Sequence, residues 1–535
     1  MVDYHFSPNA LPRNSVFAKH GMVATAQPLA AQAGLDILKQ GGNAIDAAIA
    51  TAACLTVVEP TSNGLGSDAF ALIWTKGKLH GLNASGTAPQ AMSIDAVQAR
   101  GYQKMPAHGL IPVMVPGAPA AWAACSRKFG KLPLTAVLQP AIDYAEQGFP
   151  VSPVVALNWK RAFNAYKEKF HDAMFDPWFR TFAPNGRPPE PGTLWKAPDH
   201  ARSLRAIAES ASDAFYKGEL ADRIDAFSRK HDGFIRKSDL ENYQVQWIEP
   251  ISTTYRGYEV WELPPNGQGL VALLGLNILK QFELESEAGI DTYHKQIEAL
   301  KLAFSDGKAY ITDPSEMTNE TQQLLSEAYA KERAGLIGQL AITPEPGRLP
   351  KGGTVYLATA DEDGNMVSFI QSNFMGFGSG IVIPGTGIAM QNRGYTFSLN
   401  PQDANALKPG KKTYHTIIPG FLSRNGQPVG PFGVMGGYMQ PQGHLQVISR
   451  LIDERLHPQA ALDAPRWQWM ENKTVMVEPS FPNAAAQALA RRGHDIRVAL
   501  DTGSFGRGQI IWHDPKTGVL AGGTESRADG VVAAW

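Results

Sequence analysis

A threonine follows two glycines in the stretch Lys351-Gly352-Gly353-Thr354-Val355-Tyr356, where a strand-like run over 354–360 begins. A polar turn at 361–365 and a second strand-like run at 366–374 come next, and this order predicts a β-hairpin. The residues before the glycines include three prolines between 344 and 350, which indicates an exposed loop. A loop, two glycines and a threonine at the start of a strand are what a chain needs if it is to cut its own backbone before Thr354.

The chemistry of such a cut follows from the residue types. Glycines let the backbone bend, so the Thr354 hydroxyl could reach the carbonyl of Gly353. Cleavage would leave Thr354 as an N-terminal residue with a nucleophile and a base on one amino acid. Its α-amine, with an unperturbed pKa near ~7.7, can accept the hydroxyl proton at neutral pH. From these residues alone, the alternative is a β-branched residue that opens an ordinary hairpin.

The bulk composition indicates a soluble globular enzyme. Of the 535 residues, 44% are hydrophobic and 19% are charged, and the net charge of −1 gives no general attraction to nucleic acid or to an anionic membrane. We therefore expect no nucleic-acid partner and no membrane partner. No apolar run approaches ~18 residues, and the first nine residues show no secretory signal, so a cytoplasmic location is expected.

Cysteine and histidine spacing gives no metal motif. Cys54 and Cys125 lie far apart within helical, apolar runs, which favours two buried free thiols. The 13 histidines include no H-E-x-x-H pattern, so neither a metal nor another cofactor is expected. Residues 64–69 fit a loose dinucleotide pattern, but the strand-like run 70–74 follows where that motif requires a helix. A chance match is favoured.

Short motifs occur in a fixed order along nearly the whole chain, at 20–25, 41–48, 57–60, 115–117, 146–150, 255–258, 377–382 and 461–466. Together with Gly353-Thr354 they resemble the γ-glutamyltransferase family of N-terminal-nucleophile hydrolases. The resemblance implies an α+β fold, a four-layer αββα sandwich, and autocatalytic cleavage between Gly353 and Thr354. The products would be a large subunit, 1–353, and a small subunit, 354–535, that stay paired because their strands share sheets. It leaves open whether two such heterodimers form a dimer.

The resemblance also implies roles for particular residues. Thr354 falls on the nucleophile, and Gly436-Gly437 fall on paired glycines whose backbone N–H groups bind the oxyanion. The alternative for the glycines is a tight turn after a strand. Ser372 falls on a threonine that holds the surroundings of the nucleophile. His415-Thr416 fall on two serines that contact the substrate carboxylate, although His415 could instead be a histidine with satisfied hydrogen bonds on a loop.

Two charged positions of the family are missing. Ser85 stands where the family has an arginine for the substrate carboxylate, and Thr396 stands where it has an acid for the substrate α-amine. Loss of a bidentate arginine–carboxylate contact typically removes ~2–5 kcal/mol of binding. Arg393 lies close to the second position and could receive the carboxylate of a shorter substrate; a structural salt bridge is the alternative.

We therefore expect an autoprocessed threonine amidohydrolase whose substrate is a small anionic amide such as oxamate, hydrolysed to oxalate and ammonia. Two other enzymatic functions stay open, γ-glutamyl transfer or glutathione hydrolysis and the removal of a dicarboxylic acyl group of the cephalosporin side-chain type. An unprocessed binding protein that kept the fold is the non-enzymatic alternative. Retention of Thr354, Ser372, Gly436 and Gly437 argues against it.

Overall fold

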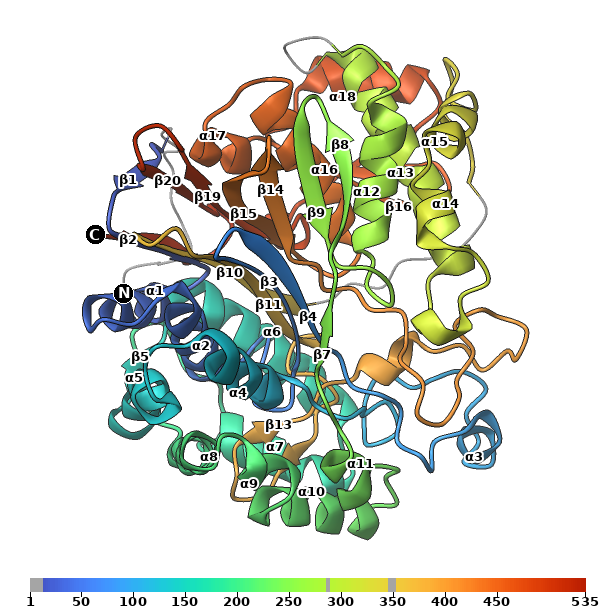
Figure 1. Cartoon of the computed structure of the whole chain (residues 1–535). Helices are drawn as coiled ribbons and strands as arrows, with labels where there is room; N and C mark the ends of the chain where they lie inside the picture. Colours follow the sequence, from blue (N-terminus) through green and yellow to red (C-terminus); the bar gives the residue numbers. More distant parts are fainter. Residues whose placement is uncertain (1–12, 285–288, 345–352) are drawn as a thin grey trace.

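Two antiparallel seven-stranded sheets lie face to face at the centre of the protein (Figure 1) in the computed structural model, which describes residues 13–284, 289–344 and 353–535. The first sheet has the order β1 (Val16–Ala18), β20 (Leu520–Thr524), β19 (Arg507–His513), β15 (Gln427–Met435), β14 (Gly420–Arg424), β9 (Tyr258–Glu262) and β8 (Ile251–Tyr255). The second has the order β21 (Val531–Ala534), β2 (Gly21–Thr25), β10 (Gly353–Asp361), β11 (Met366–Phe374), β3 (Asp68–Thr75), β4 (Lys78–Ala84) and β7 (Gln246–Ile248).

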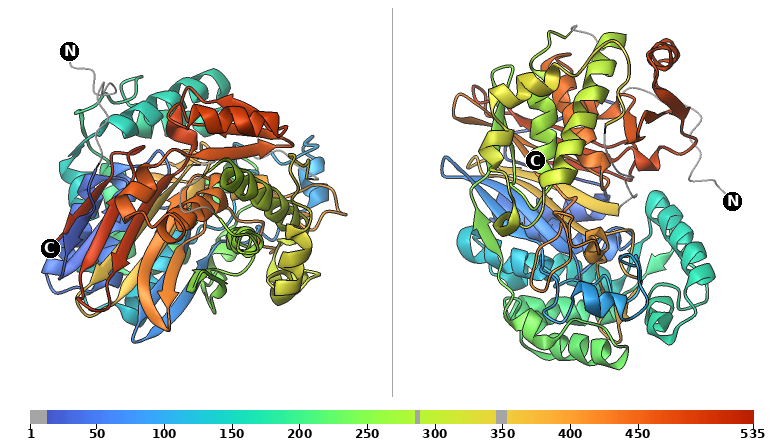
Figure 2. Two further views of the ribbon diagram at one scale, coloured as in Figure 1. Left: turned by 90° about the horizontal axis from the view of Figure 1, so that it is seen from above. Right: turned by 90° about the vertical axis from the view of Figure 1, so that its right-hand side faces the viewer.

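Helices cover the outer face of each sheet (Figure 2). On the second sheet lie α1 (Pro28–Lys39), α2 (Ala44–Val58) and α4 (Ala118–Phe129), and α5 (Leu134–Gln147) packs on α2. On the first sheet lie α12 (Gly269–Leu279) and α16 (Met439–Ile452), and α13 (Ile290–Tyr310) packs on α12. Further helices extend these layers: α6 (Pro153–Lys169), α7 (Asp176–Phe182), α8 (Pro198–Glu209), α10 (Glu219–Lys230), α15 (Glu327–Ala334), α17 (Pro458–Asp463) and α18 (Asn483–Arg491). The predicted four-layer αββα sandwich is confirmed.

An apolar layer fills the space between the two sheets. It includes Phe70 of β3, Tyr356 of β10 and Ile370 of β11 from one side, and Phe421 and Ile511 from the other. Because successive side chains of a strand point to opposite faces, every second residue of these strands faces the opposing sheet. Thr354, Ser372 and Asp68 have the same alternation as Tyr356, Ile370 and Phe70, so they lie on this inner face at one end of the sheet.

Several local predictions are confirmed. β3 and β4 form the expected hairpin around Lys76-Gly77, and β10 and β11 form the one that follows Thr354. Cys54 and Cys125 are buried free thiols in α2 and α4. Residues 64–69 lead into strand β3 and not into a helix, as expected for a chance dinucleotide match.

Strands from both sides of position 353 alternate in both sheets. In the second sheet, β10 and β11 lie between β2 and β3, and in the first, β20, β19, β15 and β14 lie between β1 and β9. A cut before Thr354 would therefore divide neither sheet. The division into 1–353 and 354–535 stays a prediction, and the expected loop at 345–350 and Gly352 lie outside the described residues.

Among the described residues, no helix combines the length and the apolar composition that a membrane span requires.

Candidate active site

The hydroxyl of Thr354 lies at the start of an inner strand, buried, with its Oγ1 3.0 Å from Ser372 Oγ. Ser372 is close to the end of the neighbouring strand β11, and it also accepts a hydrogen bond from Phe374 N–H at 2.8 Å. Phe374 has a φ of 76°, in the left-handed region that non-glycine residues seldom adopt. The bend at the end of β11 points the Phe374 N–H at Ser372 Oγ, and this hydrogen bond orients the Ser372 hydroxyl beside Thr354.

A row of three polar side chains crosses the second sheet here. Ser372 is paired with Asp68 in the β11–β3 ladder, so both side chains point to the inner face. Thr354, Ser372 and Asp68 thus come from three adjacent strands. The carboxylate of Asp68 is fully buried, which requires compensating partners.

Arg393 and His415 supply those partners. Arg393 Nε and His415 Nε2 both donate to Asp68 Oδ2, each at 2.8 Å. These positive and polar neighbours hold the pKa of Asp68 below its usual value although burial acts in the opposite direction. Asp68 is therefore an anion at neutral pH, at the centre of the buried cluster.

The guanidinium of Arg393 is fixed at two of its three nitrogens. In addition to the Nε bond, its Nη1 donates to Thr416 Oγ1 at 2.7 Å, and the group lies over the Phe374 ring at 4.4 Å from the centroid. Its Nη2 is buried and has no hydrogen-bond partner among the described residues. The expected alternative, a salt bridge, is thus present with Asp68, and the Nη2 nitrogen is still available to a ligand.

His415 is a fully buried neutral group. Its Nε2 contacts Asp68, its Nδ1 accepts from Ile417 N–H at 3.4 Å, and its ring lies 4.7 Å from that of Phe70. Burial and the nearby Arg393 charge lower the pKa of His415 to about 4. At neutral pH, His415 therefore brings no positive charge to the site. Its contact with a substrate stays a prediction.

Gly436 and Gly437 join the end of β15 to the start of α16. Their φ values are 136° and 61°, and a Cβ on Gly436 would lie 3.1 Å from Gly506 Cα, so the turn favours glycine. Gln268 donates to the carbonyls of Gly437 and Thr416, at 2.8 and 2.6 Å. This amide connects the glycine turn to the residue that holds Arg393.

The two positions that differ from the family pattern form neutral networks. Ser85 is buried and donates to Asn83 Oδ1 at 2.7 Å. Thr396 Oγ1 donates to the carbonyl of Arg393 at 2.8 Å and lies 2.8 Å from Thr413 Oγ1. Neither position presents a charge that could hold an amino-acid head group.

The four-layer architecture, with a buried threonine hydroxyl at the start of an inner strand, defines the class of N-terminal-nucleophile hydrolases, which act on C–N amide bonds. The sequence matches the Gamma-glutamyltranspeptidase family model over residues 30–535, and the chain belongs to that family.

Several relatives show the range of activities in the family. The chain is 38% identical over 531 residues to the "Glutathione hydrolase-like YwrD proenzyme" of Bacillus subtilis, covering 97% of this chain and 99% of that protein. It is 34% identical over 536 residues to the "Oxamate amidohydrolase proenzyme" of Klebsiella pneumoniae, covering 98% and 100%. A solved structure, cephalosporin acylase from Bacillus halodurans, superposes with a TM-score of 0.98 at 65% identity, covering 100% and 99%.

Asp68 is the site residue that the sequence analysis missed. It lies in the segment that was considered only as a dinucleotide motif, and its partners Arg393 and His415 are more than 300 residues away. A single acid at the start of an otherwise apolar strand was the available signal, because a buried carboxylate needs a partner.

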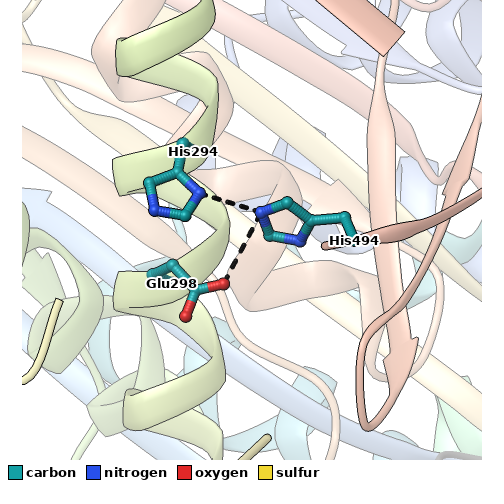
Figure 3. Close-up of side chains that lie close together, drawn as sticks. All are labelled: His294, Glu298 and His494. Carbon is teal, nitrogen blue, oxygen red and sulfur yellow. Dashed lines mark hydrogen bonds and ion pairs between the residues drawn. The ribbon is translucent and has the colours of Figure 1, made fainter. Parts of the chain in front are cut away.

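A second buried cluster was also missed. His294 and Glu298, four residues apart on α13, meet His494 (Figure 3), and together they offer three atoms with the spacing of metal ligands. His294 Nδ1 lies 2.9 Å from His494 Nε2, and His294 Nε2 contacts the carbonyl of Gly338 at 2.9 Å. Lys301 Nζ lies 2.7 Å from Glu298 Oε1, where its ammonium would oppose a bound cation.

Hydrogen bonds give this second cluster a structural role. Glu298 Oε2 accepts from Ile342 N–H at 3.1 Å, and Lys301 donates to the Ile342 carbonyl at 3.1 Å. The cluster therefore holds residues 338–342 against α13.

Proposed function

We propose that this protein is an autoprocessed threonine amidohydrolase for amides whose acyl group carries a carboxylate and no α-ammonium. The observation that carries the proposal is the buried Nη2 of Arg393, which has no hydrogen-bond partner among the described residues. Ser85 and Thr396 add no charge to the site. A buried guanidinium N–H without an acceptor is costly, so an incoming carboxylate oxygen would compensate it. A γ-glutamyl group would bring an additional ammonium for which Thr396 offers no countercharge.

Maturation would use the same hydroxyl as catalysis. Thr354 Oγ1 attacks the carbonyl carbon of Gly353, the peptide C–N bond breaks, and the acyl group passes to the oxygen as an ester. Breaking that bond frees the α-amine of Thr354, and water then hydrolyses the ester to give the Gly353 carboxylate and the free Thr354 hydroxyl. The resulting fragments, 1–353 and 354–535, would stay associated because both contribute strands to each sheet.

Amide hydrolysis then proceeds through an ester on Thr354. The α-amine accepts the hydroxyl proton as the oxygen attacks the substrate carbonyl, and the N–H groups of Gly436 and Gly437 receive the negative charge that develops on the carbonyl oxygen. The proton passes to the leaving amine as the C–N bond breaks. Water cleaves the ester and regenerates Thr354; with oxamate, the products are oxalate and ammonia.

Two sizes of acyl group fit this description. Oxamate is the smallest carboxylated amide, and the relative from Klebsiella pneumoniae bears its name. A longer dicarboxylic acyl group is the second candidate, favoured by the 65% identity to the cephalosporin acylase structure. Both lack the α-ammonium of glutathione.

The test uses glutaryl-p-nitroanilide and γ-glutamyl-p-nitroanilide, which differ only in the α-ammonium, together with oxamate. We expect kcat/KM for the glutaryl compound or for oxamate to exceed that for the γ-glutamyl compound at least tenfold. Release of ammonia from oxamate, compared with release of p-nitroaniline, identifies the preferred acyl length. Faster turnover of the γ-glutamyl compound than of both others would refute the proposal.

A further inference from the structure

The carboxylate of Asp68 accepts from three donors, all of which lie after position 353. One oxygen, Oδ2, accepts from Arg393 Nε and from His415 Nε2, each at 2.8 Å, while Oδ1 accepts from Gln391 Nε2 at 3.4 Å. All these side chains are buried. Asp68 therefore joins β3 to the residues 391–393 and 415 that surround the inner face.

The orientation of Arg393 follows from these contacts. Asp68 holds the Nε edge, Thr416 holds Nη1, and the Phe374 ring covers one face of the guanidinium. A planar guanidinium held at two nitrogens cannot turn to offer another edge. Its remaining corner, Nη2, is the one available to a ligand.

We propose that Asp68 is a positioning residue for substrate selection. By fixing Arg393 Nε, it directs the single corner Nη2 at the carboxylate of the acyl group and so confers the preference for carboxylated amides. This inference rests on the proposed function, because it specifies how the Arg393 site of that function is oriented.

The charges of the cluster support a directional mode of recognition. Asp68 and Arg393 cancel, and His415, whose pKa burial lowers to about 4, adds no charge at neutral pH. A substrate carboxylate would therefore meet a neutral cluster with one oriented donor nitrogen, Nη2. Recognition of this kind depends on geometry more than on net charge and is little affected by salt.

The experiment measures a ratio that a merely structural role would not change. Two pairs of substrates differ only in the carboxylate: oxamate with oxamide, and glutaryl-p-nitroanilide with pentanoyl-p-nitroanilide. For each pair that the parent enzyme hydrolyses, kcat/KM for the carboxylated member is divided by kcat/KM for the neutral member. Asp68→Asn retains the shape of the side chain but removes its negative charge, so the charge-assisted hydrogen bond that fixes Arg393 Nε is weakened. We expect the ratio to fall at least tenfold, mainly through KM of the carboxylated member.

A double-mutant cycle identifies Arg393 as the route of the effect. In an Arg393→Gln background, Asp68→Asn should change the ratio by less than threefold, because the group that it positions is gone. A matched control is Asp306→Asn, at a buried carboxylate outside the site. Asp306 Oδ1 is paired with Arg333 Nη2 at 2.8 Å, so this variant also removes a carboxylate from an arginine. This control should leave the ratio unchanged.

Each outcome decides the matter. An unchanged ratio in Asp68→Asn, or an equal fall in both backgrounds, would overturn the role of Asp68. If Asp68→Asn does not fold, Asp68→Glu replaces it in the experiment, because this variant keeps the charge but displaces the acceptor oxygen. It should lower the ratio in the same way. A parental ratio in Asp68→Glu would also overturn the role of Asp68. If the parent enzyme does not prefer the carboxylated member of either pair, the proposed function itself fails.

Discussion

Ser372 lies opposite Asp68 in the β11–β3 ladder, and its hydroxyl is 3.0 Å from that of Thr354. The β10–β11 hairpin and strand β3, which is distant from it in sequence, thus place a nucleophile, its hydroxyl neighbour and a buried anion in one row. The anion holds the arginine to which we assign substrate recognition. The relative positions of Thr354, Ser372 and Asp68 are therefore set by strand register.

Replacement of Ser372 by alanine should slow catalysis modestly. The variant loses one hydrogen bond to Thr354, worth about 0.5–1.5 kcal/mol, so kcat should fall roughly twofold to tenfold. Steady-state kinetics on fully processed protein provide the measurement. The control is Ser368→Ala, on the same strand, whose hydroxyl lies 2.7 Å from Tyr356 Oη. Equal rates for Ser372→Ala and the parent enzyme would contradict the assignment.

A side chain at Gly436 should impair the oxyanion site. Alanine at a φ of 136°, with Gly506 Cα 3.1 Å from its Cβ, must shift the turn and its N–H groups. Loss of one oxyanion donor costs about 2.7–4 kcal/mol, so kcat of Gly436→Ala should fall ~100- to 1,000-fold with a smaller effect on KM.

The control for Gly436→Ala is Gly426→Ala. Gly426 lies before the other end of β15, has a φ of 72°, and has open space around its Cβ position. This variant should carry the same type of backbone strain and keep the parental kcat. Because self-cleavage could use the same N–H groups, both variants are compared after processing is complete.

Changes at Arg393 should act on carboxylated substrates. Arg393→Lys removes the planar fork that contacts Asp68 and Thr416, so binding should weaken, and Arg393→Ala should weaken it further. The measurement is kcat/KM for oxamate and glutaryl-p-nitroanilide across the series. Self-cleavage should persist in both variants, since it needs no external carboxylate. Unaltered kinetics in Arg393→Ala would contradict the prediction that Arg393 binds the substrate carboxylate.

Buried histidines should make the fold sensitive to acid. Burial lowers the pKa of His200 to about 4, whereas an unfolded histidine titrates near ~6.5. The unfolded chain therefore binds more protons between these values, and stability is lost as pH falls from about 6.5 to about 4. The shift corresponds to roughly 3 kcal/mol for this group.

Thermal unfolding of the Thr354→Ala full-length protein at pH 7 and pH 4.5 measures this effect. His200→Gln should lower Tm at pH 7, because contacts with Thr56 and Gly387 are lost, but it should reduce the difference in Tm between the two pH values. His171→Gln, at an exposed histidine, should leave that difference as in the parent. An undiminished difference in His200→Gln would contradict the prediction.

Local patterns predicted much of the fold because their causes are local. The β3–β4 hairpin follows from two alternating runs around Lys76-Gly77, and the β10–β11 hairpin places Ser372 beside Thr354. The ordered family motifs added the four-layer arrangement, which composition and periodicity alone do not specify.

The clusters could not be predicted because their members are distant in sequence. Asp68 and Arg393 are 325 positions apart, and His294 and His494 are 200 apart. Their contacts depend on how the strands pack, which the sequence pattern of a single element does not contain. An acidic residue in an otherwise apolar strand does indicate a buried charge that needs a partner. For Asp68, this was the sign of its role that the sequence offered.

Intact mass spectrometry of the purified, denatured protein tests the central claim most directly. We predict two polypeptides, 1–353 and 354–535, with N-terminal sequencing of the smaller beginning at Thr354, and a single 535-residue chain for inactive Thr354→Ala. A parent protein that hydrolyses amides as an intact 535-residue chain, or a Thr354→Ala variant that still divides at this bond, would contradict the account.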